Sequence, residues 1–166
     1  MSNNEALETA LDFANTSGAV KTKYEVEVLG EDDDGTMPAN VNELANSVVG
    51  HRIIKVETVP YYPYPASNYT LERLEITLDT GRVVALKDSS DCCAFTELRS
   101  FIYNADKVDH IITGVGTTDN FETWHIYADM GDVLELHIGW SSGNPFYYGY
   151  GFEITIKDIE KEPANV

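Results

Sequence analysis

Apolar and polar residues alternate on both sides of Gly131, and this pattern constrains the fold more than any other feature of the chain. The alternating apolar positions are Trp124, Ile126, Ala128, Leu134, Leu136 and Ile138. Because successive side chains of a strand point to opposite faces, the pattern predicts an antiparallel hairpin with one buried face. We place its turn at residues 130–132, since a three-residue loop aligns the apolar positions and lets Gly131 adopt a positive φ.

The polar face of this hairpin carries the candidate ligand or partner face. The expected register sets two imidazoles opposite each other and a tyrosine opposite a glutamate. The next strand, within 147–159, should follow in the same meander, with two glycines and a tyrosine on that side. Glycines spaced by two allow a ligand or a second backbone to approach closely. The sequence therefore predicts a shallow trough formed by His125, Tyr127, Glu135, His137, Tyr147, Gly149 and Gly151.

Three interpretations of this trough remain open. The first is an ordinary sheet face, either exposed to water or covered by the chain itself. The second is a contact site for a protein or a small ligand. The third is a metal or catalytic site. The metal candidates are His125, His137 and Glu135, whose ligand types suit zinc or iron. Strand position alone does not assure that a third ligand meets the other two at one ion, so no cofactor is predicted.

The remaining segments predict further short strands and few helices. Strands are expected at 24–28, 52–59, 74–78, 82–87, 108–115, 121–129, 133–140 and 147–159, and helices at 4–14, 38–49 and 92–103. Asn40 is the expected cap of the second helix, and Asp88 to Asp91 of the third. Together they indicate an α+β protein with a five- to seven-stranded, mainly antiparallel sheet and two or three short helices. We expect an N-terminal helical segment over 1–20 and a single domain over 21–166.

Charge limits the classes of partner. The chain has 28 Asp and Glu against 11 Lys and Arg, a net charge of −17. The basic residues are scattered, so we expect no direct binding of nucleic acid, and the charge favours encounter with basic proteins. No apolar run approaches the length of a membrane span or a secretion segment. Two adjacent cysteines, Cys92 and Cys93, are expected to be reduced and packed, as in a cytoplasmic protein.

A tyrosine-rich loop is the second candidate contact surface. Tyr61, Tyr62 and Tyr64 alternate with Pro63 and Pro65. Prolines limit the conformational freedom that binding must remove, and tyrosine is enriched among residues that dominate interface energies. The sequence therefore predicts that Tyr61, Tyr62 and Tyr64 contact a partner.

Catalytic motifs are missing from the sequence. It has no phosphate-binding Gly-x-x-x-x-Gly-Lys-Ser/Thr loop, no Gly-x-Ser-x-Gly nucleophile turn and no His-Glu-x-x-His. The turn-like Gly114-Val115-Gly116 lacks the third glycine of a dinucleotide site. These absences favour a non-catalytic protein.

Several strings resemble an uncharacterised family of small proteins from actinobacteria and their bacteriophages. They are Asp91-Cys-Cys-Ala94 and the segments 108–119, 123–129 and 143–152, and the resemblance spans about residues 44–157. It implies a phage-encoded protein made in a bacterial cytoplasm. It transfers no activity and no functional residue.

Charge, tyrosine loops and missing catalytic motifs favour one function. We expect a non-catalytic acidic binding protein, phage-encoded and engaging a bacterial host protein, including the case of a nucleic-acid-mimic inhibitor. One alternative is a virion structural or decoration protein. Another is a small-ligand sponge or a metal-dependent enzyme that uses the His125/His137 face.

Overall fold

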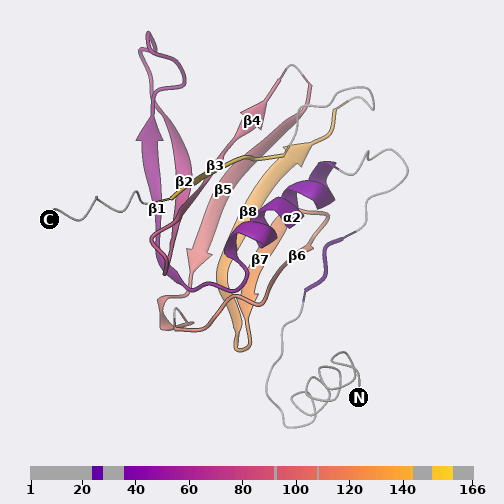
Figure 1. Ribbon diagram of the computed structural model, residues 1–166. Coiled ribbons are helices and arrows are strands. Elements are labelled where there is room, and N and C mark those ends of the chain that lie inside the picture. Colours follow the sequence, from indigo (N-terminus) through magenta and orange to yellow (C-terminus); the bar gives the residue numbers. More distant parts are fainter. Residues whose placement is uncertain (1–23, 28–35, 92, 108, 144–150, 159–166) are drawn as a thin grey trace, which may run out of the picture.

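The computed structural model describes residues 24–27, 36–91, 93–107, 109–143 and 151–158 (Figure 1). Its elements are α2 (Thr36–Val48), β1 (Ile53–Tyr61), β2 (Leu71–Leu78), β3 (Val83–Lys87), β4 (Ser89–Ser90), β5 (Phe95–Tyr103), the 3₁₀ turn η1 (Ala105–Lys107), β6 (Gly114–Thr118), β7 (Thr123–Ala128), β8 (Gly131–Ser141) and β9 (Glu153–Lys157). The helix expected at 4–14 lies outside the described residues. Within the described ranges, no helix is long and apolar enough to cross a membrane.

The strands form two antiparallel sheets. The first sheet has the order β1-β2-β3-β9, and the second has the order β4-β5-β8-β7-β6. The chain passes from one to the other at Asp88, between β3 and β4. The expected antiparallel pairing is confirmed, but nine strands in two sheets replace the single sheet of five to seven. Among the described residues there is one α-helix and one 3₁₀ turn, so the prediction of two or three helices is met only in part.

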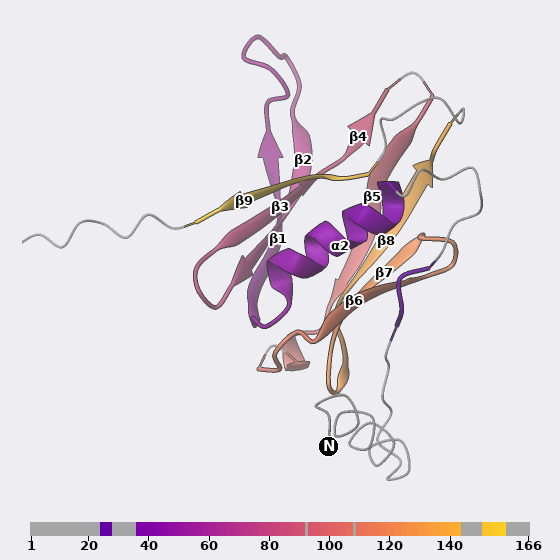
Figure 2. The same cartoon turned by 45° about the vertical axis from the view of Figure 1, so that its right-hand side comes forward.

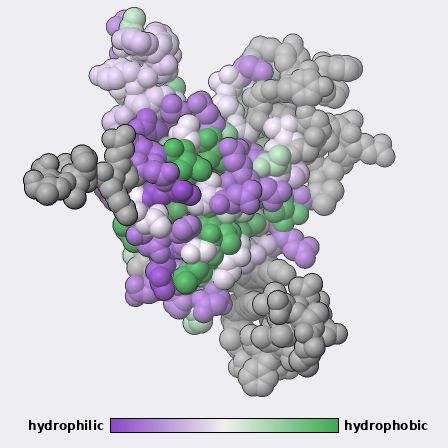
Figure 3. All heavy atoms as spheres, in the orientation of Figure 1, coloured by the Kyte–Doolittle hydropathy of each residue, from purple (hydrophilic) through white to green (hydrophobic). Residues whose placement is uncertain are grey.

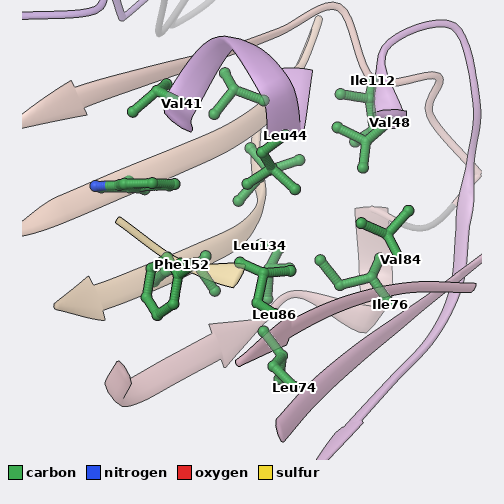
Figure 4. Packing of buried hydrophobic residues seen from close by; sticks show 14 of the residues in the cluster. Val41, Leu44, Val48, Leu74, Ile76, Val84, Leu86, Ile112, Leu134 and Phe152 are labelled. Atoms are coloured by element: carbon green, nitrogen blue, oxygen red, sulfur yellow. The ribbon is translucent and has the colours of Figure 1, made fainter. Parts of the chain in front are cut away.

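Helix α2 closes the core between the sheets. Its buried apolar residues follow the spacing of one helix face and are Met37, Val41, Leu44 and Val48. Figure 4 shows Val41, Leu44 and Val48 on the side of the helix that faces Leu134 of β8, Leu86 of β3 and Phe152, and Met37 belongs to the same buried cluster. Gly50 ends the helical segment with a φ of +87°. Both the helix over 38–49 and its terminating glycine are thus confirmed.

Asn40 joins the helix to the segment that leads into β9. The sequence assigns it to the helix cap, whereas the structure buries it within α2. Its side-chain Nδ2 donates to the Phe152 carbonyl at 2.9 Å, and its Oδ1 accepts from the Phe152 amide at 2.8 Å. The neighbouring Gly151 amide donates to Thr96 Oγ1 of β5 at 2.7 Å. Residues 151–152, which lead into β9, therefore contact the helix and the second sheet.

The helix expected over 92–103 is wrong, because β5 occupies Phe95–Tyr103. The register of β5 on β8 shifts between Leu98 and Ser100, so Arg99 is an extra residue in the strand. Such a bulge breaks the period of two. It leaves Leu98 and Phe101 on the same face three residues apart, which is the spacing of a helix. The two aspartates expected to cap this helix do accept backbone N–H groups, although no helix is there. Asp88 accepts the amide of Leu98 in β5, and Asp91 accepts the amide of Ala94 just before β5.

Candidate functional site

His125 lies at the centre of the outer face of the second sheet. Residues Gly116, His125 and Glu135 are cross-strand partners on β6, β7 and β8. The intervening Trp124 and Ile126 point the other way, into the core, and are completely buried. Histidine and glutamate therefore share the face that is turned away from the core.

A bulge adds a second carboxylate to this face. The register of β7 on β8 shifts between Ile126, which pairs with Leu134, and Tyr127, which pairs with Asp132. Val133 is the extra residue, and its side chain is completely buried. A bulge re-aims the side chains around it. Asp132 thereby lies on the same side as His125, although strict alternation would put it on the opposite side.

These residues form a compact group, the His125 cluster, made of His125, Asp132 and Glu135. His125 Nδ1 is 2.8 Å from Asp132 Oδ2, and His125 Nε2 is 2.8 Å from Thr118 Oγ1. One potential ligand atom from each cluster residue lies within 4.8 Å of the others. The side chains of His125 and Asp132 are only 7% and 14% exposed. The cluster thus combines one buried imidazole with two partly buried carboxylates.

Tyr24 covers the cluster. Its ring stacks on the His125 ring with centroids 3.6 Å apart, and its carbonyl accepts a hydrogen bond from the Tyr127 hydroxyl at 3.1 Å. A side chain at Gly116 would collide with the Tyr24 backbone, so this glycine permits the close approach. Burial, followed by the charges of Asp132 and Glu135, raises the pKa of the Tyr24 phenol. The phenol consequently stays neutral beside the two carboxylates.

The segment 24–27 is fixed along the edge strand β6, as Figure 2 shows. The Thr117 amide donates to the Glu25 carbonyl, and the Glu27 amide donates to Thr117 Oγ1, both at 2.9 Å. The Glu27 carboxylate accepts the amides of Asn120 and Phe121 at 3.0 and 2.7 Å. Both of these residues have a positive φ, which is uncommon for residues other than glycine. Glu27 thus attaches the segment 24–27 to the turn that contains Asn120 and Phe121.

The predicted trough does not form as expected. His125 and His137 do share a face on adjacent strands, but His137 pairs with Thr123 and not with His125. Tyr127 pairs with Asp132 and not with Glu135. The error is a shift of two residues, because the turn is Asp129-Met130 followed by the bulge. Gly131 has the expected positive φ, at +114°.

Of the two glycines expected in the trough, the described one, Gly151, does not lie on this face. Gly151 leads into β9, which pairs with β3 in the first sheet, so it does not lie beside His137. Tyr147 and Gly149 lie outside the described residues. The bare positions of the outer face are instead Gly114 and Gly116 of β6. A second backbone does approach there, as glycine spacing predicts, but it belongs to Tyr24 of the same chain.

A second region, at the far end of the first sheet, is open to solvent. The hairpin of β1 and β2 ends at the pair Tyr61 and Leu71, and the loop 62–70 extends beyond it (Figure 3). Three side chains of this loop form what we name the tyrosine tip: Tyr62, Tyr64 and Tyr69. They are 68%, 52% and 53% exposed. Of the tyrosines selected from the sequence, Tyr62 and Tyr64 belong to the tip, and Tyr61 lies at its base.

Hydrogen bonds within the loop order the tip. The Ser67 amide donates to the Tyr64 carbonyl at 3.0 Å, and Ser67 Oγ donates to the Tyr69 carbonyl at 2.6 Å. The rings of Tyr64 and Tyr69 meet edge to face, with centroids 6.2 Å apart. The tip is therefore both exposed and internally bonded.

A cleft of about 670 Å³ lies beside the hairpin, between β1–β2 of the first sheet and β4–β5 of the second. Its lining combines aromatic rings and charges of both signs, including Tyr61, Arg73, Asp88, Glu97, Arg99 and Phe101. Lys87 Nζ lies 4.6 Å from the centre of the Tyr61 ring. Burial raises the pKa of the Asp88 carboxyl, although its hydrogen bond from the Leu98 amide acts in the opposite direction. The cleft is thus a polar, partly desolvated hollow.

Comparison with known families identifies the main part of the chain. Residues 46–154 match a family model described as a Domain of unknown function (DUF7448). The chain belongs to this family. Comparison with curated proteins gives no match, and neither does comparison with solved structures.

The DUF7448 region contains the His125 cluster, the tyrosine tip and the cleft. The segment that covers the cluster, 24–27, lies outside it. Sequence reasoning missed Asp132 and Tyr24 in the cluster and Ser67 and Tyr69 in the tip. Only Tyr69 carried a usable signal, because it follows the tyrosine-proline run closely. Asp132 depends on a bulge and Tyr24 on a contact between distant segments, and neither follows from local pattern.

Proposed function

We propose that this chain is a non-catalytic acidic binding protein whose tyrosine tip and adjoining cleft contact a protein partner. The observation that carries the proposal is the exposure of three tyrosines on a loop that is bonded within itself. Exposed single aromatic residues are common on soluble proteins, but aromatic residues gathered on one projection are typical of contact sites.

Order within the loop favours binding. Association must offset the entropy lost when side chains and loops become fixed. The bonds of Ser67 and the contact between Tyr64 and Tyr69 fix part of this loop before any partner arrives. Tyrosine also has few rotatable bonds for its contact area. The tip therefore gives a large contact area for a small further loss of entropy.

The cleft adds recognition by charge. Asp88 and Glu97 offer carboxylates, and Arg73 and Arg99 offer guanidinium groups. Opposite charges placed at fixed positions select partners more than they add affinity. The net charge of −17 speeds encounter with a basic partner. In this proposal the net charge of the chain speeds the encounter with the partner. The charges of the cleft select the partner, and the tyrosine tip provides most of the contact energy.

The biological setting follows the same proposal. The resemblance seen in the sequence supports a phage-encoded protein that acts on a host protein in a bacterial cytoplasm. A nucleic-acid mimic is one form of such a protein, and it would use carboxylates in place of phosphates. A virion structural or decoration protein is the alternative, in which the partner of the tip is another virion protein.

The test is affinity capture from host lysate with the full chain as bait and quantitative mass spectrometry. The bait variant Y62S/Y64S/Y69S should lose the partner, and its urea midpoint should change little, because substitutions of exposed residues usually change the free energy of unfolding by less than about 0.5 kcal/mol. Ser67→Ala should weaken capture without removing a tip tyrosine. Capture that weakens as salt rises would identify the electrostatic contribution.

Met130→Ala is the matched control. Met130 is 58% exposed and lies in the turn between β7 and β8, away from the tip. It should capture the same protein as the wild type. The proposal fails if the triple tyrosine variant captures the same partner in the same amount, or if the wild-type and Met130→Ala baits enrich no protein over a blank resin.

Small-ligand capture is a second candidate function, favoured by the volume of the cleft. About 670 Å³ is within the range of small-molecule sites, roughly 300–1,000 Å³. A ligand released on denaturation of the purified chain, and lost from an Arg73→Ala/Arg99→Ala variant, would support this candidate over a protein partner. Unchanged ligand content in that variant would place the ligand elsewhere.

A further inference from the structure

The His125 cluster concentrates negative charge without a permanent positive charge to balance it. Residues 109–143 contain six Asp and Glu and no Lys or Arg. The ion-pair partners found for Asp132 and Glu135 among the described residues are His125 and His137. A histidine is a full counter-charge only when it is protonated. Two partly buried carboxylates on this face therefore attract a cation.

Two polar atoms of this face are buried and lack a hydrogen-bond partner within the described part of the chain. They are Asp132 Oδ1 and His137 Nε2. His137 Nε2 lies 3.3 Å from Glu135 Oε1, but without hydrogen-bond geometry. Unsatisfied buried polar atoms are rare and costly, about 1–3 kcal/mol each. Asp132 belongs to the cluster, and His137 adjoins it through Glu135, so an ion bound by the cluster would give Asp132 the partner that it lacks.

In one of its two neutral tautomers, His125 makes the hydrogen bonds of a metal ligand. Ligating histidines usually donate their second ring N–H to a neighbouring group, which fixes the ring. Thr118 Oγ1, 2.8 Å from Nε2, can accept that proton. The Nδ1 lone pair then faces Asp132 Oδ2 at 2.8 Å, and these atoms repel each other unless a proton or a metal ion bridges them.

The distances suit a small ion. Ligands about 2.0–2.2 Å from one ion are at most roughly 4.4 Å apart. The ligand atoms of the cluster already lie within 4.8 Å of one another, so a small closure brings all three into range. One imidazole and two carboxylates are the ligand types that zinc and manganese accept.

We propose that His125, Asp132 and Glu135 bind one divalent transition-metal ion. His137 adjoins the site through Glu135, and Thr118 holds His125 in the ligating orientation. Tyr24 covers the imidazole and limits the access of water. This inference does not rest on the proposed partner site, which lies at the tyrosine tip and the cleft beside the β1–β2 hairpin.

The test uses the full, untagged chain, stripped with chelator and then supplied with Zn²⁺ or, separately, Mn²⁺. One equivalent of at least one ion should remain after desalting, and the thermal midpoint should rise. Asp132→Asn and Glu135→Gln should each weaken binding at least tenfold. Thr118→Val should weaken it about tenfold, as losses of supporting hydrogen bonds do.

Asp129→Asn is the control, because the chain holds a second histidine–aspartate pair without the cluster. His110 Nδ1 lies 2.9 Å from Asp129 Oδ1, with both side chains more exposed than those of His125 and Asp132. This variant should bind metal as the wild type does. The proposal is overturned if the folded wild type retains neither ion, if Glu135→Gln retains as much as the wild type, or if Asp129→Asn loses binding equally. Glu135→Gln keeps the test decisive if Asp132→Asn does not fold.

Discussion

The two outer faces of the molecule use tyrosine in opposite ways. On the second sheet, Tyr24 and Tyr127 are joined to each other, and Tyr24 stacks on His125. On the first sheet, Tyr62 and Tyr64 project from the hairpin into solvent. The first pair covers the outer face of the second sheet with residues of the chain itself. The second pair leaves its aromatic rings exposed to solvent.

This difference separates stability from binding. Burying an aromatic side chain against the chain itself contributes to the free energy of folding. An exposed aromatic side chain contributes little to folding, and its burial is available to a partner. The closed face should therefore respond to substitution by a loss of stability, and the open tip by a loss of binding.

The largest effect should come from filling the space that Tyr24 occupies over β6. In Gly116→Ala the new methyl group would meet the backbone of Tyr24, which cannot move aside without breaking its hydrogen bonds. We expect the free energy of unfolding to fall by about 1–3 kcal/mol in urea titrations. Carbethoxylation of His125, followed by mass spectrometry, should also become faster.

Gly139→Ala is its matched control. Gly139 lies on β8, and a methyl group there would meet the guanidinium group of Arg99. That group ends a flexible, mostly exposed side chain, which can move aside. The cost should be well below that of Gly116→Ala. Equal losses in the two variants would mean that Tyr24 does not seal the face.

A smaller effect should follow from releasing the other end of the same segment. Glu27→Gln removes the charge that accepts two turn amides, those of Asn120 and Phe121. Hydrogen bonds to charged groups contribute about 1.5–3 kcal/mol, and Gln retains part of this as a neutral acceptor. We expect a loss of about 1 kcal/mol in the same titration.

Glu25→Gln tests whether this loss is specific. Glu25 uses its backbone carbonyl to hold Thr117, so the substitution leaves that bond in place. Its free energy of unfolding should change by less than about 0.5 kcal/mol. If both glutamine variants lose the same stability, the Glu27 hydrogen bonds do not explain the loss.

Much of the fold follows from local patterns in the sequence. The helix over 38–49 and the strands at 74–78 and 82–87, on either side of Gly81, were predicted because helical spacing and apolar alternation are local signals. The structure confirms both, with Gly81 at a φ of +86°. Two of the three tip tyrosines, Tyr62 and Tyr64, were also selected, because they stand in a run of tyrosine and proline.

The two main errors have one physical cause. Arg99 in β5 and Val133 in β8 are extra residues that shift the alternation of their strands by one. The first shift makes a strand resemble a helix, and the second moves the register of the hairpin by two residues. Bulges carry no reliable sequence signal, yet the one at Val133 brings Asp132 to His125. The contact of Tyr24 with Gly116 is also inaccessible to pattern analysis, because it joins segments far apart in the chain.

The smallest effects should come from two carboxylates next to the open region, Asp88 and Asp91, whose pKa values shift in opposite directions. Burial raises the pKa of Asp88, so the folded protein favours its neutral form. The amides of Cys93 and Ala94 lower the pKa of Asp91, so the fold favours its charged form. Ionised Asp88 therefore destabilises the fold at neutral pH, and ionised Asp91 stabilises it.

Asparagine at each position tests this contrast by urea titration across pH. At neutral pH, Asp88→Asn should raise the urea midpoint, because Asn still accepts the Leu98 amide without a buried charge. Asp91→Asn should lower the midpoint. As pH falls, the gain in Asp88→Asn should shrink first, while Asp88 of the wild type becomes protonated at its raised pKa. The loss in Asp91→Asn should persist to lower pH, until Asp91 is protonated in the folded wild type. If the two variants change the urea midpoint in the same direction at neutral pH, the interpretation is contradicted. Burial would then not dominate at Asp88, or the amide hydrogen bonds would not dominate at Asp91.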